Sequence, residues 1–152
     1  MDLSNTKVLV IDKDDRTKNQ LCQFLLKSGV LEDSLICCES TSEAMIIIES
    51  MGADLDMIFI EAKIKETDGY SVCSVINKCE ELKIPFYILA YLDEFGPIRA
   101  LSIRMQGFLK KPINFFALQA HIERWQELKS LEKKLFDVNF NLECACNGRR
   151  SN

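Results

Sequence analysis

The sequence lacks a long apolar run, a secretory leader and a strongly basic segment. Its longest apolar run, Phe86 to Leu92, is far shorter than the roughly 20 residues of a membrane-spanning helix. The first residues contain neither the basic nor the apolar region of a signal peptide. Adjacent basic residues occur only as pairs, such as Lys110-Lys111 and Arg149-Arg150, and the net charge is −4. Because binding nucleic-acid phosphates requires clustered basic side chains, we expect a cytoplasmic protein that binds neither membranes nor nucleic acids.

The cysteines do not form the even, regularly spaced set of a disulfide-stapled protein. Seven cysteines occur at irregular spacings among 152 residues, which indicates reduced thiols. Hydrophobic residues make up 47% and charged residues 28% of the chain, a balance typical of a globular protein. The length suits one domain with room for an appendage.

Two short apolar runs end abruptly in a carboxylate. Met57 to Ile60 precedes Glu61, and Lys7 to Ile11 precedes Asp12. Runs without polar alternation predict strands that are buried on both faces, as in parallel sheets covered by helices. Ligands of such sheets bind outside the carboxyl ends of the strands, so both acids are candidate site residues. The alternative for Glu61 is a solvent-facing acid at a strand end.

Strands and helices alternate along the rest of the chain. Further strands are predicted over 34–38, 86–90 and 108–112. Helices are predicted to begin near Asp15, after Ser40, near Asp68, after Gly96-Pro97 and near Asn114. This order predicts an α/β fold with a doubly wound five-stranded parallel sheet, of the (βα)5 flavodoxin-like type, and a C-terminal helical extension. Asp12, Glu61, Ala90 and Lys111 would then meet at the carboxyl edge of the sheet.

With Lys111-Pro112 after the fifth strand, residues 5–125 resemble the receiver domain of two-component response regulators. In that family an acidic pair after the first strand holds Mg²⁺, and an Asp after the third strand takes a phosphoryl group. A Ser or Thr after the fourth strand and the lysine after the fifth bind the phosphoryl oxygens. The resemblance therefore implies a role in two-component or phosphorelay signal transduction.

The chain departs from that pattern at three positions. Lys13 replaces the second acid, Glu61 replaces the acceptor Asp, and Ala90 replaces the hydroxyl residue. Only Asp12 and Lys111 keep the residue type of the family. The chain thus resembles a degenerate receiver, or pseudo-receiver, and we expect no catalytic residue and no enzymatic activity.

The charges at these positions predict a salt-bridge pocket. The negative charges of Asp12 and Glu61 balance the positive charges of Lys13 and Lys111. A pocket without net charge does not compensate Mg²⁺ for the loss of its bound water, so we expect no cofactor. The pocket either fixes one signalling state or is inert. In the alternative interpretation, Asp14 joins Asp12 and Glu61 in a weak Mg²⁺ site, and Glu61 is an unusual phosphoacceptor.

Two positions correspond to the residues that switch together in receivers. Ala90 has no hydroxyl that could bind a phosphoryl group. Phe108 occupies the aromatic position on the fifth strand, and it has no phenol hydroxyl that could form a hydrogen bond. A phenylalanine on a strand is usually a core residue, so no moving rotamer is predicted.

The last helix continues beyond the end of an ordinary receiver. Its apolar residues follow spacings of 3, 4, 3 and 4, and they are Leu128, Leu131, Leu135, Val138 and Leu142. This pattern predicts a short coiled-coil seam, which would pair two protomers, bind a partner helix, fold back on the domain or lead to an absent output domain. We divide the chain into a receiver-like domain, 1–125, and a helical extension with a flexible tail, 126–152.

Together these observations predict a single-domain atypical response regulator. It would act by phosphorylation-independent contact with a protein partner in a signalling pathway, with a homodimer formed through the C-terminal helix. The alternative is a working Mg²⁺-dependent phosphoacceptor receiver that uses Glu61.

Overall fold

The computed structural model describes residues 2–63, 71–91 and 107–150. Residues 1–117 form one compact unit and residues 118–152 form a second. The helix that we predicted after Gly96-Pro97 lies outside the described residues.

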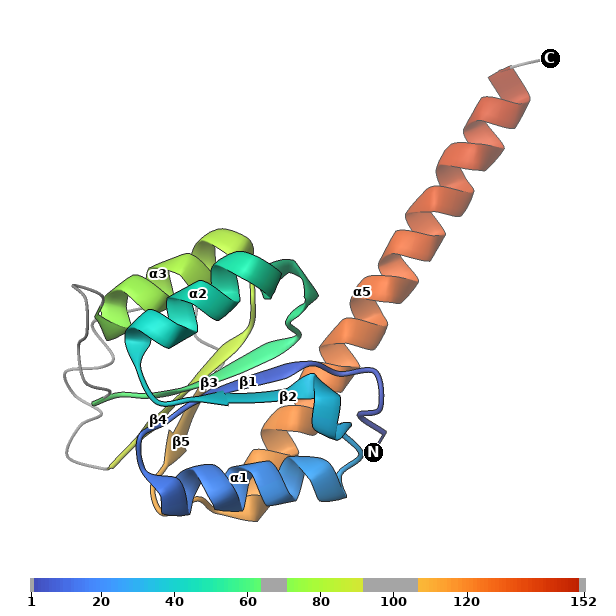
Figure 1. Cartoon of the computed structure of the whole chain (residues 1–152). Coiled ribbons are helices and arrows are strands. Elements are labelled where there is room, and N and C mark those ends of the chain that lie inside the picture. Colours follow the sequence, from blue (N-terminus) through green and yellow to red (C-terminus); the bar gives the residue numbers. More distant parts are fainter. Residues whose placement is uncertain (1, 64–70, 92–106, 151–152) are drawn as a thin grey trace. The chain divides into compact units, whose positions relative to one another are not determined.

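The first unit contains a five-stranded parallel sheet. Its strands are β1 (Val8–Ile11), β2 (Leu35–Cys38), β3 (Met57–Glu61), β4 (Phe86–Ala90) and β5 (Gly107–Lys110). They are arranged in the order β2-β1-β3-β4-β5, and every neighbouring pair is parallel (Figure 1). This is the strand order of flavodoxin-like folds, so the predicted doubly wound sheet is confirmed.

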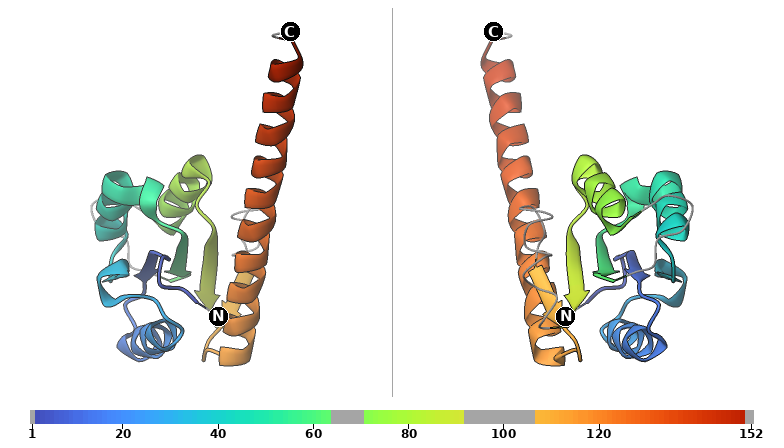
Figure 2. Two further views of the ribbon diagram at one scale, coloured as in Figure 1. Left: turned by 90° about the vertical axis from the view of Figure 1, so that its right-hand side faces the viewer. Right: turned by 90° about the vertical axis from the view of Figure 1, so that its left-hand side faces the viewer.

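Helices cover both faces of the sheet. The helices are α1 (Asp15–Lys27), α2 (Thr41–Met51) and α3 (Val72–Leu82), with short 3-10 turns at Glu32–Ser34 and Gly52–Asp54. Helices α2 and α3 lie together on one face, and α1 lies on the other, as the two views of Figure 2 also show. Every residue of β1, β3 and β4 is buried, which explains why these segments lack polar alternation.

Local signals fix where the helices begin and end. The helix starts predicted near Asp15 and after Ser40 are confirmed: Asp14 caps α1, and Ser40 caps α2 by accepting a hydrogen bond from the amide of Glu43 at 3.2 Å. Gly29 follows the end of α1 with a φ of 109°, a conformation that glycine adopts without the steric cost of a Cβ atom. Gly52 is the C-cap of α2.

The predicted start of α3 near Asp68 is wrong. The helix begins at Val72, because Ser71 has extended backbone (φ −115°, ψ 170°) and acts as its N-cap. Ser71 and Ser74 form a reciprocal capping box, in which each side chain bonds the backbone amide of the other residue. A serine at the third helical position replaces the usual Glu or Gln of this motif.

Helix α5 spans Phe115–Arg150, a continuous run of 36 residues, or about 54 Å at 1.5 Å per residue. Asn114 caps it by accepting hydrogen bonds from the amides of Phe116 (2.9 Å) and Ala117 (3.2 Å). The start near Asn114 and the continuation beyond an ordinary receiver helix are as predicted. No helix in the described part of the chain is long and apolar enough to cross a membrane.

Candidate functional site

Three charged side chains meet at the carboxyl edge of the sheet. Asp12 directly follows β1, Glu61 is the last residue of β3, and Lys111 directly follows β5. Parallel pairing aligns these strand ends, since Ile11 lies beside Ile60 and the amide of Lys111 donates to the Ala90 carbonyl at 2.8 Å. The sheet register therefore places residues that are 49 to 99 positions apart in one cluster.

The ammonium of Lys111 lies between the two carboxylates. Its Nζ is 3.0 Å from Asp12 Oδ2 and 3.1 Å from Glu61 Oε1. All three residues are buried, with exposed fractions of 0% for Asp12, 7% for Glu61 and 2% for Lys111. We refer to Asp12, Glu61 and Lys111 as the carboxylate–lysine cluster.

Lys13 does not join this cluster through its charge. Its side chain is exposed, and its ammonium makes no ion pair with any residue that the structure describes. Only its backbone N–H takes part, donating to Glu61 Oε2 at 3.1 Å. The backbone bends at Lys13, directly after β1, and it leaves Asp12 buried and Lys13 exposed. We predicted a neutral pocket of two acids and two lysines. The structure corrects this prediction, because the pocket contains two acids and only the ammonium of Lys111.

Asp14 is engaged elsewhere. Its carboxylate accepts hydrogen bonds from the amide of Arg16 (3.1 Å) and the hydroxyl of Thr17 (2.8 Å) as it caps α1. The hydrogen bond from Thr17 is the main reason that the pKa of Asp14 is lowered. Asp14 supplies the cluster with a backbone N–H, which donates to Asp12 Oδ1 at 2.8 Å.

The two acids of the cluster differ in how well their charge is stabilised. Burial, followed by the hydrogen bond with Glu61, raises the pKa of Asp12 to about 7. Burial also disfavours the Glu61 carboxylate, but the hydrogen bonds from Asp12, the Lys13 amide and Lys111 outweigh it and lower the pKa of Glu61. Asp12 Oδ2 accepts no hydrogen bond from the described residues, although the ammonium is nearby. Glu61 therefore holds the negative charge, and Asp12 is the acid that retains a proton.

Burial opposes the charge of Lys111 as well. Its two carboxylate neighbours outweigh that effect and raise the pKa of Lys111, so the ammonium stays protonated throughout the neutral range.

The carboxylate–lysine cluster does not fit a magnesium ion. Mg²⁺ requires several oxygen ligands in near-octahedral geometry, whereas both carboxylates here already contact the Lys111 ammonium. Lys13 stands at the position where the family has a third acid, and the Asp14 carboxylate caps α1. In the parts of the chain that are described, no group of three His, Cys, Asp or Glu side chains is arranged to hold a metal.

The two switch positions have apolar surroundings. Ala90 is fully buried at the end of β4, and Phe108 on β5 is partly buried and packs against the core cluster, which agrees with its interpretation as a core residue. Tyr91, which our sequence reasoning did not select, lies with its ring centroid 5.6 Å from the Lys111 nitrogen, within range of a cation–π interaction. An aromatic residue directly after Ala90 was the available signal.

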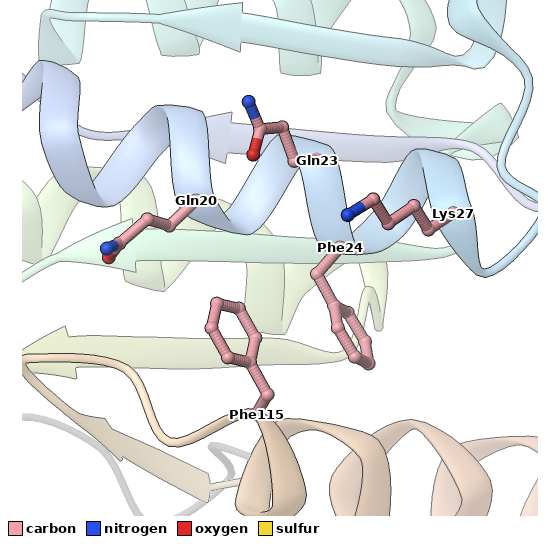
Figure 3. Close-up of a pocket in the computed structure, with 5 residues that line it drawn as sticks. All are labelled: Gln20, Gln23, Phe24, Lys27 and Phe115. Carbon is pink, nitrogen blue, oxygen red and sulfur yellow. The ribbon is translucent and has the colours of Figure 1, made fainter.

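A separate hollow of about 360 Å³ lies along α1, and sequence reasoning also missed it. Figure 3 shows the five residues that line it: Gln20, Gln23, Phe24, Lys27 and Phe115. The rings of Phe24 and Phe115 stack with centroids 5.5 Å apart. These residues include one lysine but no acid, cysteine or hydroxyl side chain, and we assign the hollow no catalytic role.

The family model described as "Response regulator receiver domain" matches residues 8–123. Among curated proteins, the chain is 26% identical over 140 residues to a cyclic di-GMP phosphodiesterase of Thermotoga maritima, covering 85% of this chain and 36% of that protein. It is also 26% identical over 110 residues to the response regulator SaeR of Staphylococcus epidermidis, covering 72% of this chain and 45% of that protein. The chain thus spans less than half the length of these relatives.

Solved structures share the fold. A response regulator receiver domain protein from Clostridium thermocellum has a TM-score of 0.68 at 19% identity and covers 83% of this chain and 98% of its own. A fusion containing the yeast Spc42 trimeric coiled coil has a TM-score of 0.68 at 16% identity, with 97% and 98% covered. The complex of the Saccharomyces cerevisiae phosphotransfer protein Ypd1 with the receiver domain of Ssk1 has a TM-score of 0.64 at 19% identity, with 80% and 88% covered.

Proposed function

Because the chain belongs to the response regulator receiver domain family, we propose that it is an atypical receiver that signals through protein contacts without being phosphorylated. The observation that carries this proposal is the Lys111 ammonium, which is held between Asp12 and Glu61 at 3.0 and 3.1 Å. Membership of the family supports a role in two-component signalling with a protein partner, and these contacts support the proposal that the role does not depend on phosphorylation.

The residues present are poorly suited to phosphoryl transfer. The extra methylene of Glu61 displaces the carboxylate by roughly 1 Å relative to an aspartate, and a displacement of that size can slow in-line chemistry about 10²-fold. Ala90 supplies no hydroxyl, and the acids do not fit Mg²⁺, so the phosphoryl oxygens would lose two of their stabilising contacts. We therefore assign no enzymatic activity and no cofactor to this chain.

The same contacts support a fixed signalling state. Glu61 accepts hydrogen bonds from the backbone of Lys13 and from the ammonium of Lys111, so both of its oxygens are engaged. In receivers, the conserved lysine binds the phosphoryl oxygens, and here Lys111 binds a carboxylate oxygen instead. We propose that this arrangement holds the domain in one functional state, in preference to a pocket that only stabilises the fold.

The output of this state is contact with a protein. The receiver domain of Ssk1 is bound to Ypd1 in a solved complex, which illustrates the kind of partner that a domain of this fold accepts. We propose a partner of the same broad class, a signalling protein, for the domain that we assign to residues 1–125.

The extension at 126–152 is proposed to bring two copies of the chain together. Its seam residues are between 44% and 64% exposed, an unusual exposure for five regularly spaced apolar side chains. They are Leu128, Leu131, Leu135, Val138 and Leu142. A second copy of the same helix would bury this stripe by knobs-into-holes packing.

The competing function is a working phosphoacceptor in which Glu61 accepts the phosphoryl group with Mg²⁺ bound by Asp12 and Asp14. That reading requires Asp14 to leave Arg16 and Thr17, and it requires Lys111 to release at least one carboxylate.

A titration with Mg²⁺ followed by beryllofluoride, a phosphoryl mimic, separates the two functions. We expect the backbone amide shifts of the full chain to stay unchanged at millimolar metal. The matched control restores the residue types of the family with Lys13→Asp, Glu61→Asp and Ala90→Thr, and it should gain saturable shifts around residues 12, 61 and 111.

Saturable shifts around Glu61 and Lys111 in the unmodified chain would contradict the proposal and support the phosphoacceptor. If the amide shifts stay unchanged in the unmodified chain but change in the triple variant, the residues at these three positions are what prevents this receiver fold from binding the metal and the phosphoryl mimic.

A further inference from the structure

Two cysteines face each other across the gap between α1 and the edge of the sheet. Cys22 lies in the second half of α1, and Cys37 lies on β2, the strand at one end of the sheet order. Their Sγ atoms are 3.0 Å apart, close enough for an S–H···S hydrogen bond. Only 15 residues separate them in the sequence, so one short connection brings both thiols to the same place.

An ion pair lies beside the thiols. Lys18 precedes Cys22 by one helical turn, and Glu39 follows Cys37 by two residues, directly after the end of β2. Lys18 Nζ is 2.6 Å from Glu39 Oε1 and 3.2 Å from Asp15 Oδ1. The thiol pair therefore joins α1 to β2, and the ion pair joins α1 to the residue that follows β2.

The two thiols are not equivalent. Cys37 is exposed and Cys22 is half-buried, so Cys37 is the better site for a thiolate. The hydrogen bond from Cys22 outweighs the effect of burial and, with the charge of Lys18 nearby, lowers the pKa of Cys37 to about 7. The same hydrogen bond, followed by burial, raises the pKa of Cys22.

Among the other described cysteines, Cys73 is exposed but has no cysteine in contact with it. Cys38 and Cys79 are buried, and burial raises the pKa of each to about 12. Cys38 is instructive because it is next to Cys37 in sequence, yet it points to the opposite face of the sheet and belongs to the hydrophobic core.

We propose that Cys22 and Cys37 form a reversible dithiol site that reacts with small disulfides by thiol–disulfide exchange. The Cys37 thiolate attacks one sulfur of the small disulfide, forming a mixed disulfide and expelling one small thiolate, which takes a proton from water. Cys22 then loses its proton and attacks Cys37 Sγ, which forms the Cys22–Cys37 bond and releases the second small thiolate, protonated in turn. The protein thus loses two protons and two electrons, which reduce the small disulfide to two thiols.

The bond would tie α1 covalently to the edge strand. It would close a loop through the turn after α1 and the 3-10 turn Glu32–Ser34, all within the first compact unit. The carboxylate–lysine cluster contains no cysteine, so this chemistry is independent of the proposed function.

The test treats the reduced full-length chain with oxidised glutathione and maps the disulfides by mass spectrometry of peptides. We expect a Cys22–Cys37 crosslink in the unmodified chain that dithiothreitol reverses. The Cys22→Ser variant should stop at a mixed disulfide on Cys37, and Cys37→Ser should lose the crosslink completely. Cys38→Ala is the matched control, and it should form the crosslink to the same extent as the unmodified chain.

Three results would overturn the site. One is a mixed disulfide on Cys37 that persists in the unmodified chain without giving way to the crosslink. The second is a crosslink that survives Cys37→Ser but disappears in Cys38→Ala. The third is the absence of any reaction at residues 22 and 37 while circular dichroism shows that the chain is folded.

Discussion

Asp12 has the least stabilised charge of the carboxylate–lysine cluster. It is fully buried, one of its oxygens accepts a hydrogen bond from the Asp14 amide, and the other lies near the Lys111 ammonium without a hydrogen bond from the described residues. Two carboxylates that share one ammonium cannot both be compensated, so one of them favours its protonated form. The cluster therefore couples the stability of the fold to pH.

The direction of this coupling follows from the raised pKa of Asp12. The folded protein keeps a proton on Asp12 up to a pKa of about 7, whereas the unfolded chain releases it near 3.8. The stability that this proton contributes is complete below pH 3.8 and is lost as the pH rises to about 7. We expect the Asp12 contribution to unfolding free energy to fall over this interval by at most about 1.4 kcal/mol per pH unit.

The Asp12→Asn variant should flatten that slope, because asparagine resembles the protonated acid and does not titrate. Urea unfolding of both proteins at several pH values between 4 and 8 measures the difference. The comparison is needed because burial, with Arg124, lowers the pKa of His121 and gives an opposite slope in the same interval. Asp54→Asn, at an exposed acid, is the control and should keep the slope of the unmodified chain. Parallel curves for Asp12→Asn and the unmodified chain would contradict the assignment.

For single residues, the sequence predicted where the site residues lie in the fold better than it predicted which of their atoms are in contact. Asp12, Glu61 and Lys111 could be brought together because each ends a predicted parallel strand. Whether the ammonium of Lys13 or only its amide would reach Glu61 depends on how the backbone turns after β1, which no residue pattern specifies. The contact between Cys22 and Cys37 was missed because it requires the relative rotation of α1 and β2.

At the scale of the element, α5 is the least conventional part of the chain. Its five seam residues recur at spacings of 3 and 4, and all are exposed. Two further apolar side chains, Phe136 and Phe140, are exposed at 69% and 57%, and at 100° per residue they lie on a different side of the helix from the seam. Isolated helices are marginal in water, so a long helix with this much exposed apolar surface favours association.

The double variant Leu131→Asp with Leu135→Asp should abolish self-association through the seam. It places two charges where a second helix would pack, and burying an unpaired charge costs several kcal/mol. Size-exclusion chromatography with light scattering should report half the molar mass of the unmodified chain. The control is Lys129→Gln with Lys133→Gln, which changes the net charge by the same −2 at the same spacing, on the side of the helix away from the seam. A monomeric unmodified chain, or a control that also dissociates, would refute the seam.

The elements that were predicted accurately are those with strong local signals. The apolar runs located the buried strands, and Asp14, Ser40 and Asn114 marked three helix starts. The start of α3 was misplaced because Asp68-Gly69 resembles a helix start, whereas the capping box of Ser71 and Ser74 decides it. Two serines at this spacing are a weaker signal than the usual pairing of a serine with Glu or Gln.

At the scale of the whole molecule, the alternation of strands and helices was enough to predict the topology. Short right-handed crossovers between parallel strands leave few arrangements, and the order β2-β1-β3-β4-β5 is one of them. Such rules do not determine where the receiver-like domain ends and the helical extension begins. Here the family match to residues 8–123 is the useful guide, because the proposed boundary at residue 125 lies just beyond it and all seam residues follow it.

A chain that ends at residue 125 should therefore fold and remain monomeric. It contains the whole matched segment but none of the seam residues, so self-association should be lost while cooperative thermal unfolding is retained. Circular dichroism would follow unfolding, and light scattering would report the molar mass. The contrasting variant ends at Pro112, inside the matched segment, and should not unfold cooperatively because it lacks the start of α5. A dimer formed by residues 1–125 would place self-association in the receiver domain, and an unfolded one would place the domain boundary farther along α5.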